Sequence, residues 1–482
     1  MTRAGLESRI ARNSAFLMAG EGLARVLNLV IAILLYRYLK PEGSGVMGFV
    51  ISYGVLLGIV TEFGLTRAAV REIARAPRGE MPQAMGHIIL IRAVLTVFTL
   101  AVIWGSLFTP LGRTIDTTTK WLIFMWSWSV AFQAFRRNSE IVFQALEQLH
   151  YQAFFLALNR IIASLLIVIS VITGRGLCFI FAAYLIADFI DAVLAAWVVR
   201  ARIERATFNV DRAKLAGLVR ASVPFGLQLL AGQIYFYIDS VLIYYLYQGG
   251  SANSEIGFYR AAGQMVLTLQ FIPISVCNAL YAPFVKACRE NRARLKSLFG
   301  HSYNLFALGG MVVTLFFFSF RSEFILLVFG ERYRPTIGMF ELLIWSLPMI
   351  FMTMPLSNLL AASDRQGVVT ITACLTAVVN VVFNVLLIPR YGGLGAAIAM
   401  LATSAFALLT QFVYVAKHQK EIFDWPNLLG QTIFHAAAIA LLTALDRHDV
   451  TFRVCVYVVY AIIVVYWGYM MMRRRREVSR AE

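Results

Sequence analysis

Charged residues are scarce in this sequence of 482 residues. They make up 14% of the chain, whereas 60% of the residues are hydrophobic and the mean hydropathy is +0.72. A soluble domain usually carries about 25% charged residues. The composition therefore excludes a soluble protein and indicates that most of the chain lies in a membrane.

Long polar stretches are missing as well. Apolar runs of roughly 20 residues follow one another from Ser14 almost to the last residue, and they are too long and too uniformly apolar for barrel strands. We therefore predict an all-α integral membrane protein with about fourteen transmembrane helices. The predicted spans are 14–37, 45–64, 87–108, 119–136, 152–173, 177–199, 221–247, 256–283, 302–320, 335–361, 367–388, 394–415, 428–445 and 452–472.

No group of residues in the sequence indicates catalysis. The cysteines lack the spacing of metal ligands, and they are Cys178, Cys277, Cys288, Cys374 and Cys455. No nucleophile or nucleotide motif is present, and no outer connection is long enough for the acceptor site of a membrane polymerase or glycosyltransferase. We expect neither an enzyme nor a resident cofactor.

The basic residues have a one-sided distribution. The net charge is +17, and the greater part of the 43 Lys and Arg residues falls on one side of the predicted spans. That side is expected to be cytoplasmic, with both termini there. This accounts for the charge without nucleic acid as a partner. The basic run at 473–476 is interpreted as an anchor beside anionic membrane lipids. The first apolar run is too long for a signal peptide, so we expect it to be retained.

The most basic connector, at 200–220, separates the first twelve spans into two groups of six. Groups with an even number of helices have the same orientation, which predicts a parallel repeat with the substrate path between its halves. The predicted divisions are an N-terminal lobe at 1–199, a basic cytoplasmic linker at 200–220, a C-terminal lobe at 221–417, and two further helices with a basic tail at 418–482.

Three stretches carry a recognisable pattern. The first, at 13–75, contains RYLKPEGSG at 37–45, EFGL at 62–65 and REIAR at 71–75; the second contains YID at 237–239, IGFYRAA at 256–262 and a segment between prolines at 273–283; the third contains NVVFN at 380–384, IP at 388–389 and GGLGAA at 392–397. Together they resemble the O-antigen flippase type, the polysaccharide-exporting branch of the multidrug/oligosaccharidyl-lipid/polysaccharide (MOP) superfamily. The resemblance covers nearly the whole chain.

The resemblance implies a MATE-like fold with two six-helix lobes, a V-shaped cavity, alternating access and an additional C-terminal helix pair. It implies a flippase that moves polyprenyl-pyrophosphate-linked oligosaccharide from the cytoplasmic to the periplasmic leaflet of the bacterial inner membrane, for cell-surface polysaccharide biosynthesis. The alternative is an ion-coupled multidrug or cation antiporter of the same superfamily, whose cavity would favour acidic residues over arginines. Neither the glycan nor the need for a polysaccharide polymerase or assembly partner is implied.

Ionisable side chains inside the spans mark the candidate site, because a charge in a bilayer usually faces a cavity or a partner. Arg25 lies roughly 16 Å along the first span. It either binds pyrophosphate as a cavity cation or pairs with Glu21 one turn earlier. Arg160 is a second candidate cation. Arg92 lies near the predicted cytoplasmic edge of its span, so we expect its side chain to snorkel to the surface.

Acidic residues supply the other candidates of this lobe. Asp188 and Asp191 share one face of the sixth span at i, i+3. Two interpretations are open: the pair binds a proton or a cation, or it neutralises Arg25 or Arg160.

A coupling-ion site is expected in the other lobe, where Asp239 and the i, i+4 pair Asn380 and Asn384 offer oxygen ligands. The resemblance implies sodium here, as in the lipid-precursor branch of the superfamily, with a proton as the other coupling ion. The asparagines otherwise join helices by hydrogen bonds. Arg260 lies at a comparable depth and either pairs with Asp239 or binds phosphate.

Prolines inside the predicted spans indicate kinks, because each removes a helical hydrogen bond. They are Pro224, Pro273, Pro348 and Pro355.

Overall fold

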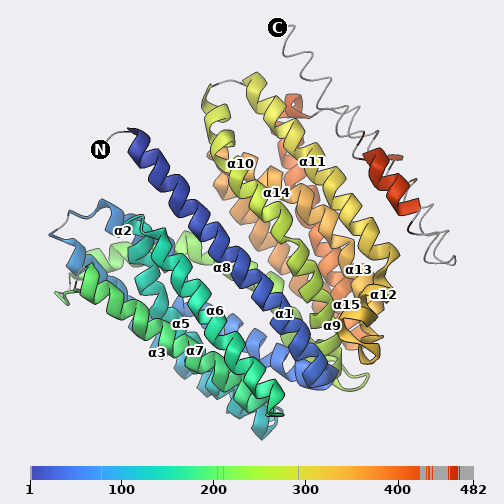
Figure 1. Ribbon diagram of the computed structural model, residues 1–482, viewed down its shortest axis with the longest axis horizontal. Coiled ribbons are helices and arrows are strands. Elements are labelled where there is room, and N and C mark those ends of the chain that lie inside the picture. The colour runs from blue at the N-terminus through green and yellow to red at the C-terminus, as the bar shows by residue number, and fades with distance from the viewer. Residues whose placement is uncertain are drawn as a thin grey trace. The chain divides into compact units, whose positions relative to one another are not determined.

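The computed structural model describes residues 3–423 except 78, 204, 210 and 291, and beyond them residues 430, 433, 434, 437, 454, 456–464 and 466; the side chains of residues 3–26 and 290 are not described. The described part is built of helices and contains no strand, which confirms the predicted all-α class (Figure 1). Contacts between Cα atoms divide the chain into unit 1, Met1–Gly257, and unit 2, Phe258–Glu482. The predicted spans 428–445 and 452–472 lie largely outside the described residues.

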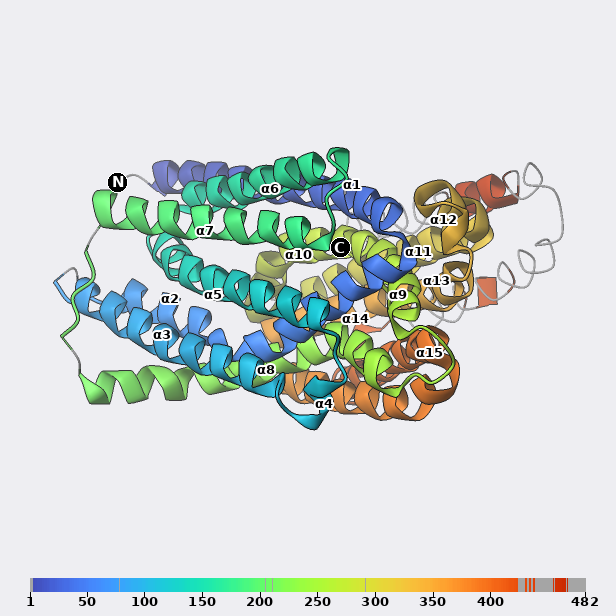
Figure 2. The same ribbon diagram turned by 90° about the horizontal axis from the view of Figure 1, so that it is seen from below.

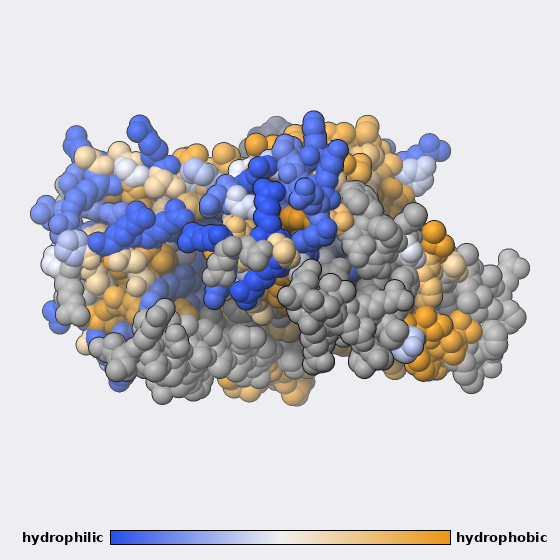
Figure 3. Space-filling view, turned by 90° about the horizontal axis from the view of Figure 1, so that it is seen from above, coloured by the Kyte–Doolittle hydropathy of each residue, from blue (hydrophilic) through white to orange (hydrophobic). Residues whose placement is uncertain are grey.

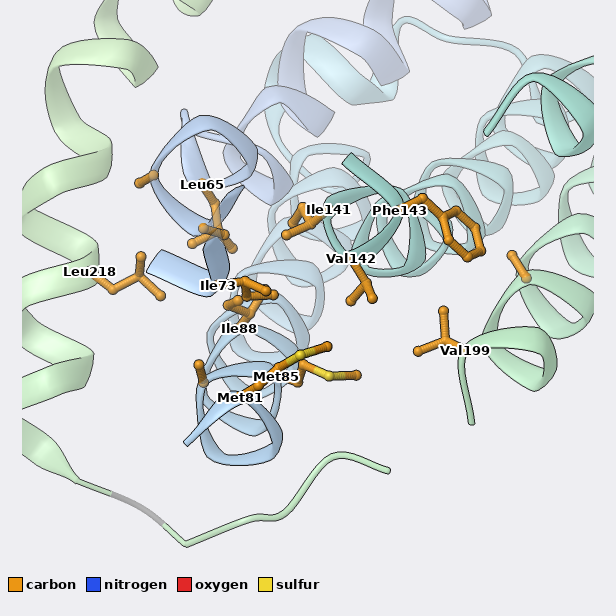
Figure 4. Close-up of a cluster of buried hydrophobic side chains, with 14 of the residues drawn as sticks. Leu65, Ile73, Met81, Met85, Ile88, Ile141, Val142, Phe143, Val199 and Leu218 are labelled. Atoms are coloured by element: carbon orange, nitrogen blue, oxygen red, sulfur yellow. The ribbon is translucent and has the colours of Figure 1, made fainter. Parts of the chain in front are cut away.

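Unit 1 consists of long helices joined by short elements. They are α1 (Arg3–Gly58), η1 (Ile59–Thr61), α2 (Leu65–Arg75), α3 (Met81–Ser106), α4 (Pro110–Arg113), α5 (Thr117–Ala145), α6 (Leu149–Ile172), α7 (Leu177–Arg202), α8 (Arg212–Leu246) and the beginning of α9 (Ala252–Leu269). Helix α5 lies between α3 and α7 and packs against both, and α6 packs against α1 and α7 (Figure 2). An apolar core joins α2, α3, α5 and α7 through Ile73, Ile88, Val142 and Val199 (Figure 4).

Unit 2 holds the rest of the chain. After the end of α9 it contains α10 (Phe271–Glu290), α11 (Arg292–Ser319), α12 (Arg321–Phe329), η2 (Glu331–Tyr333), α13 (Thr336–Ile344), α14 (Ser346–Ala362), α15 (Gln366–His418) and η3 (Lys420–Ile422). Helix α14 packs against α10, α11 and α15, so it is the central helix of this unit. Its core includes Phe284, Phe299, Leu356 and Leu359.

Within the described residues, nine helical segments are long and apolar enough to cross a membrane. The segment Leu27–Arg75 contains the predicted span 45–64 and the end of 14–37, and Gln366–His418 contains both 367–388 and 394–415. The predicted span 119–136 falls in α5, which is not among the nine, because Lys120 and Arg136 bound a short apolar stretch and Gln133 interrupts it. A multi-pass membrane protein is thus confirmed, while the number fourteen stays a prediction.

The helices bend where the backbone leaves the helical region. In α1 the bend is at Lys40, which has a φ of 62° and precedes Pro41, and in α15 it is at Gly392, with a φ of 56°. Two predicted spans are divided: 256–283 between α9 and α10 and 335–361 between α13 and α14. Each division lies three residues before a proline, Pro273 or Pro348, which cannot donate to the helical ladder.

Two helix boundaries differ from prediction in a way that changes the site. Helix α3 starts at Met81, before the predicted 87, and α5 continues to Ala145, beyond the predicted 136. Hydropathy marks where apolar side chains begin and end, but a helix continues through polar residues that find partners. Arg136 and Arg137, which hydropathy assigns to a cytoplasmic connection, therefore lie inside α5.

The outer helix faces carry many exposed apolar side chains, including Phe98 on α3, Trp197 on α7 and Leu386 on α15. In the face shown in Figure 3, hydrophilic residues gather together and hydrophobic residues cover much of the other described surface. Lipid contact explains this exposure.

Helix α8 groups with the helices before it through contacts with α1 and α2. The predicted lobes at 1–199 and 221–417 are the two halves of a proposed structural repeat, which the division into units does not test. These lobes stay a prediction.

Candidate functional site

The site begins at a break in the second span. The chain leaves helical geometry between η1 and α2, where Gly64 has a φ of 76°. The carboxylate of Glu62 lies beside this break, and Oε1 accepts a hydrogen bond from the backbone N–H of Thr66 at 3.3 Å. A carboxylate at the first turn of a helix also interacts favourably with the helix dipole. The break thus holds Glu62 at the start of α2.

Arg92 on α3 is the buried partner of this carboxylate. Its Nη1 donates to Glu62 Oε2 at 3.0 Å, its Nε donates to Asn138 Oδ1 at 2.7 Å and its Nη2 donates to Thr66 Oγ1 at 3.3 Å. The side chain is 0% exposed. The snorkelling predicted for Arg92 is wrong, because α3 starts earlier than hydropathy indicates and Arg92 lies roughly 16 Å inside it.

Arg137 on α5 binds the same carboxylate oxygen. Its Nη1 lies 2.9 Å from Glu62 Oε2, and its side chain is 35% exposed. It faces a cavity of about 270 Å³ within unit 1. The lining contains the polar residues Thr61, Glu62, Thr66, Gln133, Arg137, Glu140 and Gln233 and the apolar residues Val55, Gly58, Ile59, Val130 and Leu229. The cavity therefore offers both signs of charge, amide groups and hydroxyl groups.

A second ion-pair chain continues from the cavity into the protein. The guanidinium of Arg136 lies 3.2 Å from Glu140 and 3.3 Å from Asp191 Oδ2. Glu140 also accepts a hydrogen bond from Gln152 Nε2 at 2.8 Å. Asp191 is 0% exposed, so its charge depends on Arg136. The ion-pair partner of Asp191 is therefore Arg136, whereas the sequence predicts Arg25 or Arg160. The difference arises because α5 continues past residue 136, which keeps Arg136 inside the helix.

Asp188 is held by amides. Its Oδ2 accepts from Gln133 Nε2 at 2.9 Å and its Oδ1 accepts from Asn159 Nδ2 at 3.0 Å. Arg160 interacts with this carboxylate electrostatically, and both sequence interpretations of Asp188 stay predictions. Within the described part of the chain, the buried Nε of Arg160 has no hydrogen-bond partner. Gln133 lines the cavity as well, so it connects Asp188 to that space.

The residues of the expected coupling-ion site belong to different units. Asn384 Nδ2 donates to Asn380 Oδ1 at 3.1 Å, and both residues are 0% exposed in unit 2. Asp239 is buried in unit 1, and neither it nor Arg260 of unit 2 is without a partner. Among the described residues, no group of three or more His, Cys, Asp or Glu residues could hold a metal. The coupling-ion site stays a prediction.

Two further candidates, Glu21 and Arg25, lie on α1, and their side chains are outside the described residues. The cavity instead depends on Glu62, Arg137 and Glu140, which sequence reasoning missed as site residues. A signal exists for them: charges at 136, 137 and 140 directly follow an apolar run, and Glu62 stands between two helical runs. Whether such charges end a helix or lie within it and face a cavity depends on their partners on other helices. Hydropathy does not detect these partners.

The comparisons with known proteins agree with this architecture. A family model described as a polysaccharide biosynthesis protein matches residues 10–287. No curated protein matches the chain in sequence. A structure of the lipid II flippase MurJ, in an inward closed conformation, is 13% identical with a TM-score of 0.76, covering 95% of this chain and 99% of the other.

Two transporters of the MOP superfamily have a similar fold. An inward-facing multidrug resistance MATE family transporter is 16% identical with a TM-score of 0.68, covering 83% of this chain and 95% of its own. A transporter from Pyrococcus furiosus, described by the reverse polarity of its binding pocket, is 16% identical with a TM-score of 0.58, covering 86% and 95%. The predicted MATE-like fold is confirmed, and at these identities the likeness concerns the fold alone.

Proposed function

Because this chain belongs to the family of polysaccharide biosynthesis proteins, as the sequence resemblance predicts, we propose that it is a flippase for lipid-linked oligosaccharide. It moves a polyprenyl-pyrophosphate-linked glycan from the cytoplasmic to the outer leaflet by alternating access. The protein is multi-pass. We place it in the bacterial inner membrane with both termini in the cytoplasm, where the basic connections favour that orientation.

The observation that carries this proposal is the polar cavity of unit 1. Arg137 is partly exposed in it and shares Glu62 with Arg92, while Gln133, Glu140 and Gln233 supply further donors and acceptors. A guanidinium fork suits phosphate oxygens, and amides with carboxylates suit sugar hydroxyls. A glycan linked through pyrophosphate presents both groups. The MurJ structure, named as a lipid II flippase, supports a lipid-linked substrate for this fold.

An ion-coupled multidrug or cation antiporter is the second candidate. The MATE structures share the fold, and the buried carboxylates Asp188 and Asp191 are groups that a cation or a proton could use. The ion pairs favour the flippase instead, because Arg92, Arg136 and Arg137 already occupy carboxylates that a cation would need, and Arg137 is partly exposed to the cavity. Both candidates are transporters, so catalysis is not part of either.

Replacing Arg137 by glutamine is expected to lower the flipping rate at least tenfold, since a hydrogen bond to a charged group contributes about 1.5–3 kcal/mol. Flipping of a fluorescent polyprenyl-pyrophosphate oligosaccharide is measured in proteoliposomes. Arg137→Lys keeps the charge but not the fork, so it should recover only part of the rate. The control Arg334→Gln removes an exposed arginine that pairs with Glu331 and should leave the rate unchanged.

Equal rates for the wild type and Arg137→Gln would contradict the role of this cavity. No lipid transport by the wild type, together with export of a cationic dye driven by an ion gradient, would replace the flippase by the antiporter. Arg25→Ala and Arg25→Lys in the same assay test the cavity cation predicted on α1. A sodium or proton gradient imposed on the vesicles tests which ion drives transport.

A further inference from the structure

A second chamber of unit 1 lies apart from the polar cavity. It has a volume of about 380 Å³, within the usual range for ligand pockets of roughly 300–1,000 Å³. Helices α3, α5 and α7 form most of its wall, which is mainly apolar: it includes Met85, Phe135, Val142 and Val199, with Asn138 and Ser139 as polar members. Figure 4 shows Met85, Val142 and Val199 pointing toward the same space. The chamber can therefore take an apolar chain.

The remaining wall is the segment 205–209, which lies between α7 and α8. It is fixed to the beginning of α3: the N–H of Thr207 donates to the carbonyl of Pro82 at 2.9 Å, and His87 Nε2 lies 3.1 Å from the Asn209 carbonyl oxygen. A side chain at Gly86 would collide with the Thr207 carbonyl oxygen, so the backbones meet directly. The segment thus closes the chamber at a defined position.

Two exposed arginines line this chamber at its rim. Arg200 belongs to the last turn of α7, and Arg205 belongs to the fixed segment. The last turn of a membrane span lies at the level of the lipid headgroups, where a basic side chain meets anionic phosphates. An apolar interior below a pair of arginines matches an amphiphile with an anionic head.

We propose that this chamber binds one anionic phospholipid of the membrane, with part of an acyl chain between α3, α5 and α7 and the phosphate on Arg200 and Arg205. The site is separate from the polar cavity and does not depend on the proposed transport activity. The small volume favours the end of a single acyl chain over a long polyprenyl chain.

Native mass spectrometry of the purified chain tests this, with phosphatidylglycerol and phosphatidylcholine of equal chain length as probes. The double variant R200Q/R205Q should lower the affinity for phosphatidylglycerol about 25-fold, since each basic group near an anionic surface contributes about a factor of five. Ala206→Phe fills the chamber from the segment 205–209 and should weaken binding as well. Phosphatidylcholine should bind weakly to every variant.

The matched control is R202Q/R212Q, which removes the same charge from exposed arginines that do not line the chamber. It should bind phosphatidylglycerol within twofold of the wild type. Equal weakening by both double variants, or wild-type affinity in Ala206→Phe, would overturn the proposal. Displacement of phosphatidylglycerol by a polyprenyl phosphate of higher affinity would overturn the phospholipid as occupant. If R200Q/R205Q does not fold, Ala206→Phe decides alone.

Discussion

Glu62→Gln is expected to lower the stability of the protein by about 3–5 kcal/mol, the usual cost of leaving one member of a buried ion pair without its partner. The substitution keeps the shape of the side chain but removes its charge. Arg92 is 0% exposed and donates to Glu62 at 3.0 Å, so its guanidinium would lose its nearest anion in a place that water does not reach. Arg137 would be less affected, because it is partly exposed.

The measurement is the midpoint of thermal unfolding in detergent, together with the yield of monodisperse protein. Glu331→Gln is the control: Glu331 pairs with Arg334 at 2.7 Å, but the side chains are 71% and 65% exposed. An exposed pair contributes about 0–1 kcal/mol, so this variant should remain close to the wild type. Adding Arg92→Leu to Glu62→Gln should recover part of the stability, since the buried charge is then gone. An unchanged midpoint in Glu62→Gln would show that Arg92 does not need this carboxylate.

Gly64→Ala is expected to destabilise unit 1 by about 2–5 kcal/mol, for two reasons that add. The φ of 76° is unfavourable for any residue with a side chain. A methyl group would also collide with the backbone of α8, at the nitrogen of Gly226 and the carbonyl oxygen of Ser222. Neither backbone can move away easily, because Pro224 lies beside this contact and α2 packs along α8.

Fluorescence-detected size-exclusion chromatography after heating measures this effect. Gly232→Ala provides the control within α8, since no atom lies within 4 Å of the position that its Cβ would take. Alanine inside a helix is favoured over glycine by roughly 0.5–1 kcal/mol, so this variant should be as stable as the wild type or slightly more so. Similar midpoints for Gly64→Ala and the wild type would mean that the break between η1 and α2 has another conformation available.

The fold could largely be predicted from hydropathy, because a lipid-facing helix must be apolar over the whole thickness of the membrane. The segment Leu149–Ile172, for example, corresponds closely to the predicted 152–173. The ends of the helices could be predicted less well where polar residues continue a helix. The first turn of α3 includes Pro82 and Gln83, and the last part of α5 includes Asn138 and Glu140, so hydropathy excludes residues that are helical.

The site could be predicted only in part, since its chemistry depends on which helices pack against one another. Asp188 and Asp191 could be identified as costly buried charges from their positions in a span. Their partners could not, because Gln133, Asn159 and Arg136 come from two other helices. Arg92 shows the same limit: a shift in the start of α3 changes it from a surface residue into the most enclosed cation near the cavity.

The arrangement of two guanidinium groups on one carboxylate oxygen has a consequence for ligand exchange. Both Arg92 and Arg137 reach Oε2 of Glu62, at 3.0 and 2.9 Å. If Arg137 turned toward an incoming anion, as the proposed function requires, Glu62 would keep its hydrogen bonds from Arg92 and from the N–H of Thr66. The arginine would then leave no isolated charge behind, and Glu62 would be available to pair with it again after the anion dissociates. Because Glu62 is shared, neither binding nor release of the anion would strand a buried charge. Such an arrangement suits a transporter, which must release its substrate after binding it.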